Sequence, residues 1–514
     1  MRQTVQSDMF LRSGLRAGAL VLAALFCVAC GADEPAAESA AESAAQLTAD
    51  AAGGGGGQPD AVADDTQAAS GAQDEPAEVE APQEETVPVA AAEPAAPPAE
   101  ALPPLPDYPE ETPVFERPEH VRGIYLNAWA SGSRRKVTNL LAMVEGTEVN
   151  AFVIDLKDAT GYVSHRSSVP TVAKIGADKD RRIGNLHTLL WRMKEAGVYP
   201  IARIVIMKDP KLSDAFPDMA VQDTAGGPWV DGKGQVWLNP FDRDVWDYHL
   251  ALAREAVEAG FPEIQWDYVR FPDAPRSEIE RTAYPGRDGQ TRSAAIRAFL
   301  SYTRKELGAL GVPVTADVFG VTTSATRDVG IGQVWEDFID VVDVALPMVY
   351  PSHYWKGSFG FDTPNAYPYE IVYEALIRAQ RRTAAVEGAG TVRPWLQDFT
   401  LGKPRYGAPH VRAQIQATYD AGIPEWILWN PSSRYSQEAF APADGYAEGA
   451  EPLIPVADST VVASEAMAFL EATREAERAA KAEAEAEAER AAAEAAADPG
   501  VTEAAADTTG AGNR

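Results

Sequence analysis

The segment 265–272 places one carboxylate where a strand is expected to end. Its sequence, QWDYVRFP, is an apolar and aromatic run that carries Asp267 near its carboxyl end, and Pro272 then prevents a central strand from continuing. In a barrel of alternating strands and helices, reactive groups gather at the carboxyl ends of the strands, where the loops leave room for a ligand. Asp267 is therefore the first candidate for a catalytic residue.

The ends of the other expected strands carry further carboxylates, aromatic rings and hydrogen-bonding groups. Flat rings cover the apolar C–H faces of a sugar, polar groups satisfy its hydroxyls, and hydrolysis of a glycosidic bond typically uses two carboxyl groups. This mixture predicts a poly- or oligosaccharide substrate. The residues expected to bind it are Asp155, Lys157, Asp158, Arg270, Tyr350, Asp398, Trp429 and Asn430.

Asp267 and Asp317 are the expected catalytic pair. They lie at similar places on consecutive expected strands, and each is followed two residues later by a bulky apolar residue. Neighbouring strands are ~4.8 Å apart, which is compatible with the ~5 to 5.5 Å between the carboxyl groups of a retaining glycosidase. We expect Asp267 to be the nucleophile and Asp317 the general acid/base, with a pKa raised by burial or by a charged neighbour.

Each of these residues also has an interpretation that involves no substrate. An aspartate at a strand end can cap the next helix or pair with a nearby arginine. Asp155, Lys157 and Asp158 can form an internal salt-bridge group, and Arg270 can hold a carboxylate in place. Tryptophans at barrel ends are often packing residues. The sequence leaves both interpretations open.

Alternating strand and helix patterns surround these residues. Eight apolar, β-rich runs occur at 122–128, 151–157, 201–207, 264–269, 314–320, 344–350, 394–399 and 426–430. Helical periodicity fills the intervals, for example at 134–144, 186–196, 245–259, 293–310, 368–382 and 409–421. Eight such alternations predict a (β/α)8 barrel, with an open doubly wound sheet as the alternative. The alternative predicts G-x-G-x-x-G after the first strand, and no such motif follows Gly123.

One joint recurs four times between a helical and a β-rich pattern. A glycine, one or two apolar residues and a proline occur in the segments 196–200, 259–262, 310–313 and 421–424. Glycine takes the left-handed position that follows a helix, and proline is placed where a strand starts. These segments are expected to be αβ corners of the barrel.

Composition divides the chain into a globular centre and acidic ends. The formal net charge is −31, and all eleven tryptophans lie between Trp129 and Trp429. The barrel domain is expected at 113–455, long enough for roughly 250 residues of barrel with insertions. No basic face is evident there, so we expect no nucleic-acid partner.

The first thirty residues have the pattern of an export signal. Arg2, Arg12 and Arg16 precede an apolar run of about a dozen residues, shorter than the ~20 of a spanning helix. The run ends at Cys30, which resembles the lipidated cysteine of a bacterial lipobox, although Cys27 occupies the usual leucine position. We expect an exported, lipid-anchored protein, with the outer membrane favoured because Gly31 rather than Asp follows Cys30; a plain signal peptide is the alternative.

The remaining flanks have low-complexity compositions. Residues 31–112 are rich in Ala, Glu, Pro and Gly, which predicts a disordered acidic linker. An exposed Ala/Glu-rich helix is expected at 456–497 and a disordered tail at 498–514. Cys27 and Cys30 are the only cysteines, so the mature domain has no disulfide or thiolate zinc site. We expect no cofactor and no metal.

The region 121–440 resembles a bacterial family of glycoside-hydrolase-like TIM-barrel proteins, distantly similar to the α-amylase-like glycosidases. The matching motifs are RGIY at 122–125, VIDLKD at 153–158, QWDYVRFP at 265–272, MVYP at 348–351 and PWLQD at 394–398. The resemblance implies the fold, a sugar-related function and a nucleophile at Asp267. In the α-amylase-like pattern an Arg lies two residues before the nucleophile and the acid on the next strand is Glu. Gln265 and Asp317 take those places here.

Other classes of barrel protein predict different residues. Metal-dependent hydrolases commonly carry His-x-His on the first strand, and only His353 of the six histidines is placed at a strand end. A phosphate-binding barrel needs glycine-rich loops after the last two strands, and the loops at 400–403 and 431–433 lack them. The remaining alternative to a hydrolase is a glycan-binding or envelope-scaffolding lipoprotein that keeps the barrel without catalysis.

Overall fold

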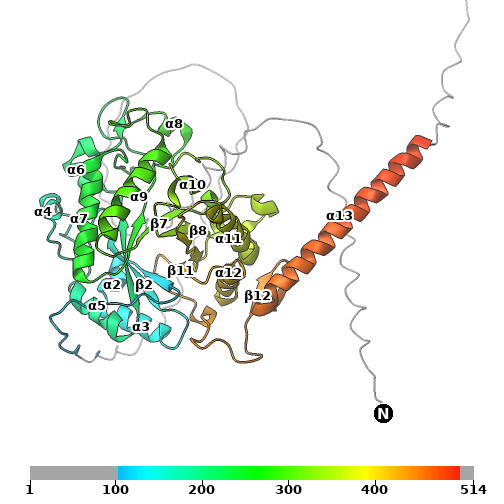
Figure 1. The fold of residues 1–514 in the computed structure, drawn as a ribbon, viewed down its shortest axis with the longest axis horizontal. Helices are drawn as coiled ribbons and strands as arrows, with labels where there is room; N and C mark the ends of the chain where they lie inside the picture. The colour runs from blue at the N-terminus through cyan, green and yellow to red at the C-terminus, as the bar shows by residue number, and fades with distance from the viewer. Residues whose placement is uncertain (1–101, 103, 498–514) are drawn as a thin grey trace, which may run out of the picture.

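The computed structural model describes residues 102 and 104–497, and eight parallel strands close into a barrel within it (Figure 1). The strands are β1 (Arg122–Leu126), β2 (Ala151–Lys157), β3 (Tyr199–Val205), β5 (Ile264–Asp267), β7 (Val314–Phe319), β8 (Val344–Met348), β10 (Trp395–Gln397) and β11 (Trp426–Trp429). They pair in that order, and pairing of β11 with β1 and of β10 with β8 completes the circle. The predicted (β/α)8 barrel is confirmed. The predicted signal peptide, Cys30, most of the linker and the tail lie outside the described residues.

Helices connect the strands and surround the barrel (Figure 1). They are α2 (Ala128–Gly132), α3 (Arg134–Val144), α4 (Pro170–Ile175), α5 (Leu186–Glu195), α6 (Pro210–Ala215), α7 (Arg243–Ala259), α8 (Arg276–Ile279), α9 (Arg292–Gly308), α10 (Trp335–Phe338), α11 (Pro368–Ala384) and α12 (Ala408–Asp420). The short strands β4 (Gln222–Asp223) and β6 (Thr282–Ala283) pair with each other, and β9 (Thr391–Val392) pairs with β8. The long connections after β3 and β5 therefore carry extra structure over the carboxyl ends of the strands.

The four predicted corners share one backbone conformation. Gly197, Gly260, Gly311 and Gly422 all have φ between 67° and 110°. In each corner the residue after the glycine is buried and donates its N–H to the carbonyl five residues back, as Val198 does to Met193 at 2.9 Å. This is the Schellman arrangement, which ends a helix and directs the chain toward the core. The prediction of αβ corners is confirmed.

Two apolar cores result from the alternation of side chains along the strands. Inward residues such as Val153, Ile201, Leu346 and Ile427 fill the barrel below its carboxyl end. Outward residues pack against the helices in a much larger core; Trp266, for example, lies edge-to-face on Phe299 of α9. Residues of the same parity as Val153 and Ile201 must therefore point into the barrel.

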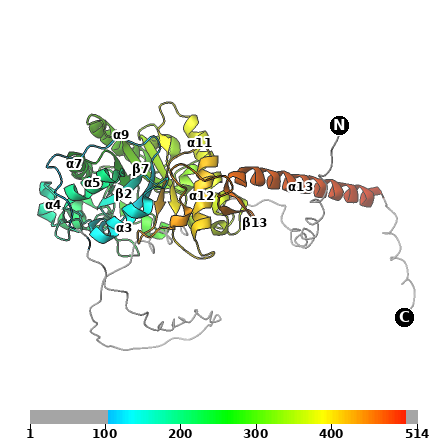
Figure 2. The same cartoon turned by 90° about the horizontal axis from the view of Figure 1, so that it is seen from below.

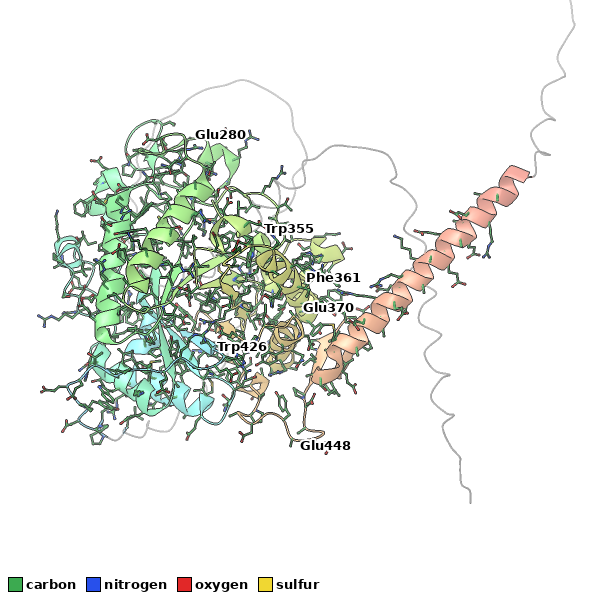
Figure 3. The ribbon with its side chains drawn as sticks, in the orientation of Figure 1. Glu280, Trp355, Phe361, Glu370, Trp426 and Glu448 are labelled. Carbon is green, nitrogen blue, oxygen red and sulfur yellow. The ribbon has the colours of Figure 1, made fainter. Side chains whose placement is uncertain are left out.

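The chain continues after the barrel into a hairpin and one long helix. The hairpin strands β12 (Leu453–Val456) and β13 (Ser459–Val462) precede α13 (Ala466–Ala497), which projects away from the barrel in both views (Figures 1 and 2). Glu370 of α11 faces this side (Figure 3), and it accepts a bond from the N–H of Ala457. The expected helix from residue 456 is corrected: it starts at Ala466, because buried Ile454 and Val456 alternate as in a strand.

No helix within residues 102 and 104–497 combines the length and the apolar content that crossing a membrane requires.

Candidate active site

Arg203 lies at the centre of the charged layer that fills the carboxyl end of the barrel. It is on β3, with the same inward parity as Tyr199 and Ile201. Its Nη1 donates to Asp155 of β2, and its Nη2 and Nε donate to one oxygen of Asp267, the latter bond being 3.0 Å. One guanidinium thus joins carboxylates from the strands on either side of it.

Asp267 is the last residue of β5 and is held on both carboxylate oxygens. Oδ2 accepts from Arg203, and Oδ1 accepts from the N–H of Tyr268 at 2.5 Å. Tyr268 has φ 52°, an uncommon left-handed conformation for a residue with a side chain. Such backbone outliers cluster at functional sites. The turn at Tyr268 fixes the orientation of the carboxylate relative to the strand.

Asp317 of β7 is the second carboxyl group of the predicted pair. Gln265 Nε2 donates to its two oxygens at 2.9 and 3.0 Å, Trp395 Nε1 donates to Oδ1 at 2.7 Å, and Arg203 Nε lies 3.9 Å from Oδ2. Burial raises the pKa of Asp317 well above its usual range, and the charge of Asp267 raises it further. Asp317 is thereby disposed to hold a proton.

The strand register places the two carboxyl groups side by side. Trp266 of β5 is opposite Ala316 of β7, so the next residues along these strands are Asp267 and Asp317. Both side chains contact Arg203, which shows that both point into the barrel and neither points into the helix layer. The structure therefore gives the pair the arrangement expected from the sequence.

Asp155 and Trp429 join the same cluster. Asp155 accepts hydrogen bonds from Arg203 and from the Tyr125 hydroxyl, and burial raises its pKa to about 6. The ring of Trp429 stacks on Tyr125 with centroids 4.0 Å apart, and Arg203 lies 5.2 Å from the Trp429 centroid. Asp155 and Trp429 are thus brought together with the predicted pair.

Lys157 and Asp158 lie away from this cluster. The β2–β3 register shifts between Asp155 and Lys157, so Lys157 leaves the inward face. Its Nζ lies 3.0 Å from buried Asp209 and donates to the Val205 carbonyl at 2.7 Å. Asp158 accepts from Arg182 at 3.1 Å at the surface. Both residues are in ion pairs, the interpretation without substrate that the sequence left open.

Tyr350 lines a small cavity beside the cluster. The cavity has a volume of about 40 Å³ and is lined by Phe319, Gly320, Val321, Met348, Tyr350, His353, Tyr354 and Trp355, the last of which is labelled in Figure 3. Tyr350 meets His353 edge-to-face at 5.2 Å. Burial lowers the pKa of His353 to about 4, so this histidine is neutral at pH 7. The cavity can accept an apolar group of a ligand.

Asp398 and Asn430 form a separate pair at the ends of β10 and β11. Asp398 accepts from the backbone N–H of Ser436 at 2.7 Å and from its hydroxyl at 2.8 Å, and Asn430 donates to the Asp398 carbonyl. Burial raises the pKa of Asp398 to about 6. These contacts hold the 431–436 loop against the barrel rim, near Trp429.

Arg270 lies three residues after Asp267 in the chain. Its Nη1 donates to Asp273 at 2.6 Å, and its guanidinium is 4.8 Å from the Tyr268 centroid and 4.8 Å from the Trp237 centroid. It thus holds a carboxylate and packs on two neighbouring aromatic rings, three residues after the predicted nucleophile.

Sequence reasoning missed Arg203, Tyr125 and Gln265 as site residues, and it noted Trp395 only as an aromatic residue at a strand end. The signal for Arg203 is a charged residue in the run YPIARIV at 199–205, an otherwise apolar strand whose inward parity could have been assigned from its neighbours. Gln265 is opposite Arg203 in the β3–β5 register. The arginine that the α-amylase-like pattern places two residues before the nucleophile is therefore supplied by the neighbouring strand.

Within residues 102 and 104–497, no three His, Cys, Asp or Glu side chains are grouped so that they could hold a metal ion.

Three comparisons place the barrel among known proteins. Among solved structures, a hypothetical protein from Ruminiclostridium thermocellum is 37% identical over 38% of this chain and 97% of that one, with a TM-score of 0.35. The PgaB (BpsB) glycoside hydrolase domain from Bordetella bronchiseptica is 14% identical over 61% and 95%, with a TM-score of 0.44. Alpha-L-fucosidase isoenzyme 2 from Paenibacillus thiaminolyticus is 16% identical over 62% and 48%, with a TM-score of 0.41. No curated protein matches.

A family model matches residues 123–435, more than half of the chain, and its description is "Putative glycosyl hydrolase domain". The match spans β1 to β11 and includes Asp155, Arg203, Asp267 and Asp317. The expected resemblance to a glycoside-hydrolase-like family is confirmed. The chain belongs to this family, and its barrel is a glycosidase-like domain.

Proposed function

We propose that the barrel hydrolyses a glycosidic bond of a poly- or oligosaccharide with retention of anomeric configuration. The observation that carries this proposal is the pair formed by Asp267 and Asp317. They are adjacent in register, both point into the carboxyl end of the barrel, and burial raises the pKa of Asp317 well above its usual range. Two carboxyl groups with different environments are what acid and nucleophile roles require.

In the first step Asp267 attacks the anomeric carbon while the glycosidic C–O bond breaks. The proton of Asp317 passes to the departing oxygen, so the leaving group departs as an alcohol. In the second step Asp317, now a carboxylate, takes a proton from water, whose oxygen displaces Asp267 from the anomeric carbon. Asp317 ends the cycle protonated and Asp267 ends it free.

Arg203 is a positioning residue in this scheme. It donates two hydrogen bonds to Oδ2 of Asp267, so Oδ1 is the oxygen that is held only by the N–H of Tyr268. A guanidinium also stabilises the carboxylate that must be ionised to attack. Tyr125 and Trp429, stacked beside Arg203, offer the aromatic surface that a sugar ring needs.

A second candidate function, glycan binding without hydrolysis, is favoured by one observation. Asp155, Arg203, Asp267 and Asp317 are only 2, 5, 7 and 2% exposed. A buried layer of paired charges is also compatible with a purely structural role of these residues. Catalysis requires the residues above Asp267 to move when substrate binds, whereas a binding protein needs no access to the carboxylates.

Hydrolysis assays with substituted protein separate the two functions. The full chain is screened against α- and β-linked oligosaccharides and aryl glycosides, together with Asp267→Asn, Asp317→Asn and the control Asp247→Asn, whose half-exposed side chain lies on α7. We expect Asp267→Asn to abolish turnover. Asp317→Asn should release dinitrophenol from dinitrophenyl glycosides in a stoichiometric burst, because this leaving group needs no proton, and should then turn over slowly, because the second step has lost its base. It should not hydrolyse oligosaccharides.

Two results would contradict this proposal. Glycan binding by wild type and both variants, with no product from any linkage, would establish the binding function. Equal turnover by wild type and Asp267→Asn would contradict Asp267 as the nucleophile.

We also propose that the chain is exported and anchored through a lipid on Cys30, with the outer membrane as the favoured location. The support is the cationic and apolar pattern of residues 1–29 and the cysteine that follows it. Labelling with a radioactive fatty acid in the native cell should mark wild type and not Cys30→Ser. Equal labelling of both would contradict the anchor.

A further inference from the structure

Lys208 is a lysine with a mostly buried side chain, and no hydrogen bond or ion pair in the described part of the chain involves its ammonium group. It follows β3 and is 8% exposed, and within the described residues no carboxylate or carbonyl lies within hydrogen-bond or ion-pair distance of its Nζ. Its one close contact is the ring of Tyr268, whose centroid is 5.3 Å from Nζ. Tyr268 directly follows Asp267, so the ammonium group lies on the ring of the residue next to the predicted nucleophile.

This arrangement does not compensate the burial of a charge. A cation–π contact supplies roughly 0.5 to 2 kcal/mol, whereas the effective cost of removing an ammonium group from water is several kcal/mol. Other lysines of the domain avoid this cost: Lys157 pairs with Asp209, and Lys211 lies at the surface over Tyr162. An unpaired ammonium group on a side chain that is nine-tenths buried is placed to meet an anion of a ligand.

The surrounding charges define the anion. Arg270 also lies on Tyr268, but Asp273 already neutralises it at 2.6 Å. The other charged groups that act on Lys208 are Asp231 and Asp273, which raise its pKa, and Lys233, which lowers it. Asp231 is occupied by the N–H groups of Lys233, Gln235 and Trp237. The cluster therefore has one uncompensated positive charge, and two nearby carboxylates that would repel a dianion.

We propose that Lys208, supported by Arg270, is an anion-recognition subsite beside Asp267, and that the substrate is a sugar that carries a carboxylate, such as a uronic acid. This inference rests on the proposed function, because it assigns a substrate class to that site. A singly charged carboxylate on the sugar ring matches the single free ammonium, and the neighbouring rings of Tyr268 and Trp237 both contact Arg270.

Burial and the nearby Arg270 lower the pKa of Lys208 to about 8. The ammonium is therefore present at pH 7 and is lost above about pH 8. Affinity for a carboxylate sugar should fall between pH 7 and pH 9.5, and affinity for a neutral sugar should not.

Binding is measured by calorimetric titration of the full chain at pH 7. The probes are the methyl α- and β-glycosides of glucuronate and galacturonate, their neutral glucose and galactose counterparts, and methyl glucoside 6-sulfate and 6-phosphate. Lys208→Met is compared with Lys194→Met, an exposed lysine in the last turn of α5 at the opposite end of the barrel. We expect a uronide to bind about tenfold more tightly than its neutral counterpart, a preference that Lys208→Met abolishes and Lys194→Met retains.

The inference is overturned if no uronide binds, if uronides bind no better than neutral glycosides, if Lys208→Met keeps the preference, or if the sulfate or phosphate ester binds more tightly than every uronide. Asp267→Asn separates this inference from the hydrolase proposal. A uronide preference that survives in this variant, in a protein that hydrolyses nothing, would support the subsite and contradict only the hydrolase.

Discussion

A single arginine organises the charges at the carboxyl end of the barrel. Arg203 bonds to Asp155 and Asp267 and lies 3.9 Å from Asp317. Three carboxyl groups around one guanidinium cannot all be ionised without uncompensated negative charge. The raised pKa values of Asp155 and Asp317 follow first from burial, with Arg203 opposing the rise in both. Burial thus favours the protonated form of Asp317, the form that the acid of a glycosidase needs.

Replacing Arg203 by Lys should lower kcat by about 10²-fold, since the positioning of Asp267 depends on a fork of N–H groups that an ammonium lacks. The matched control is Arg393→Lys at the opposite end of the barrel, where Arg393 is buried and bonds to Glu263 at 2.6 Å and Glu425 at 2.8 Å. Both variants should lose stability, because each disturbs a buried ion network. Steady-state kinetics and chemical denaturation of both variants test this. Equal losses of kcat would assign Arg203 a purely structural role.

Asp398→Asn should make the free energy of unfolding less sensitive to rising pH. The pKa of Asp398 in the folded state is about 6, above its value in the unfolded chain. The ionised carboxyl group therefore destabilises the fold, by an amount that is absent below pH 4 and complete above pH 6. A shift of about two units corresponds to about 3 kcal/mol. The free energy of unfolding of the variant, relative to wild type, should rise by about that amount between pH 4 and pH 7.5. A constant difference would show that burial does not raise this pKa.

The sequence was sufficient to predict that Asp267, Asp317 and Asp155 lie together at the carboxyl end of the barrel, because the parity of a strand and the position of its end decide where a carboxylate points. Their roles stay predictions. It was insufficient for Lys157, since the irregular register after Asp155 depends on how β2 meets β3 and has no signature in the run AFVIDLK. Arg203 was missed for another reason. Its role depends on the strand register that places it opposite Gln265, which only the assembled barrel defines.

Four equivalent corners set the geometry of the barrel elements. In each corner a helix ends at a glycine with a left-handed φ, and the residue after that glycine is buried. Strand and helix positions could be predicted because these corners and the apolar runs between them are local signals. Pro200 departs from the expectation that a corner proline lies where a strand starts, since it lies inside β3 opposite Phe152. The N–H that proline lacks would have had no strand partner, because β5 begins only opposite Ala202.

Replacing the corner glycine by alanine should lower the free energy of unfolding by different amounts at two of the corners. Gly197 has φ 67° and open space where a Cβ would lie, whereas at Gly260 φ is 110° and a Cβ would lie 2.9 Å from the Pro113 carbonyl oxygen. Gly197→Ala should cost about 1 kcal/mol for the left-handed conformation alone, and Gly260→Ala should cost at least about 2 kcal/mol. Denaturant unfolding of the two variants measures this difference. Equal costs would contradict the role given to the backbone contact.

At the scale of the whole molecule, the barrel and the C-terminal helix are joined by a small apolar contact. Ile454, Val456, Ala466 and Leu470 are buried against the barrel, and Arg474 bonds to Glu374 of α11. The helix of 32 residues is roughly 48 Å long. Residues 475–493 are almost all exposed and project from the domain (Figure 2). The sequence predicted this helix from composition, but the hairpin before it was missed because its strands have only four residues each.

Two truncations should therefore behave differently. A chain that ends at residue 478 should unfold at the same denaturant concentration as the full chain. A chain that ends at residue 452 loses the buried side chains of Ile454, Val456 and Leu470, and exposes the barrel surface they cover. At roughly 1.5 to 3 kcal/mol for each buried aliphatic side chain, it should lose about 5 kcal/mol. Equal stability of the two truncated chains would contradict this contact as part of the fold.

The proposed hydrolysis requires Asp267 to form a covalent bond with the sugar. The direct measurement is peptide mass spectrometry of the full chain after reaction with a 2-deoxy-2-fluoro glycoside of the sugar that it hydrolyses, since the fluorine slows breakdown of the covalent intermediate. We predict one glycosyl adduct, on Asp267, that accumulates and then turns over. An adduct on another residue, or release of the inverted anomer with no adduct, would contradict the central claim.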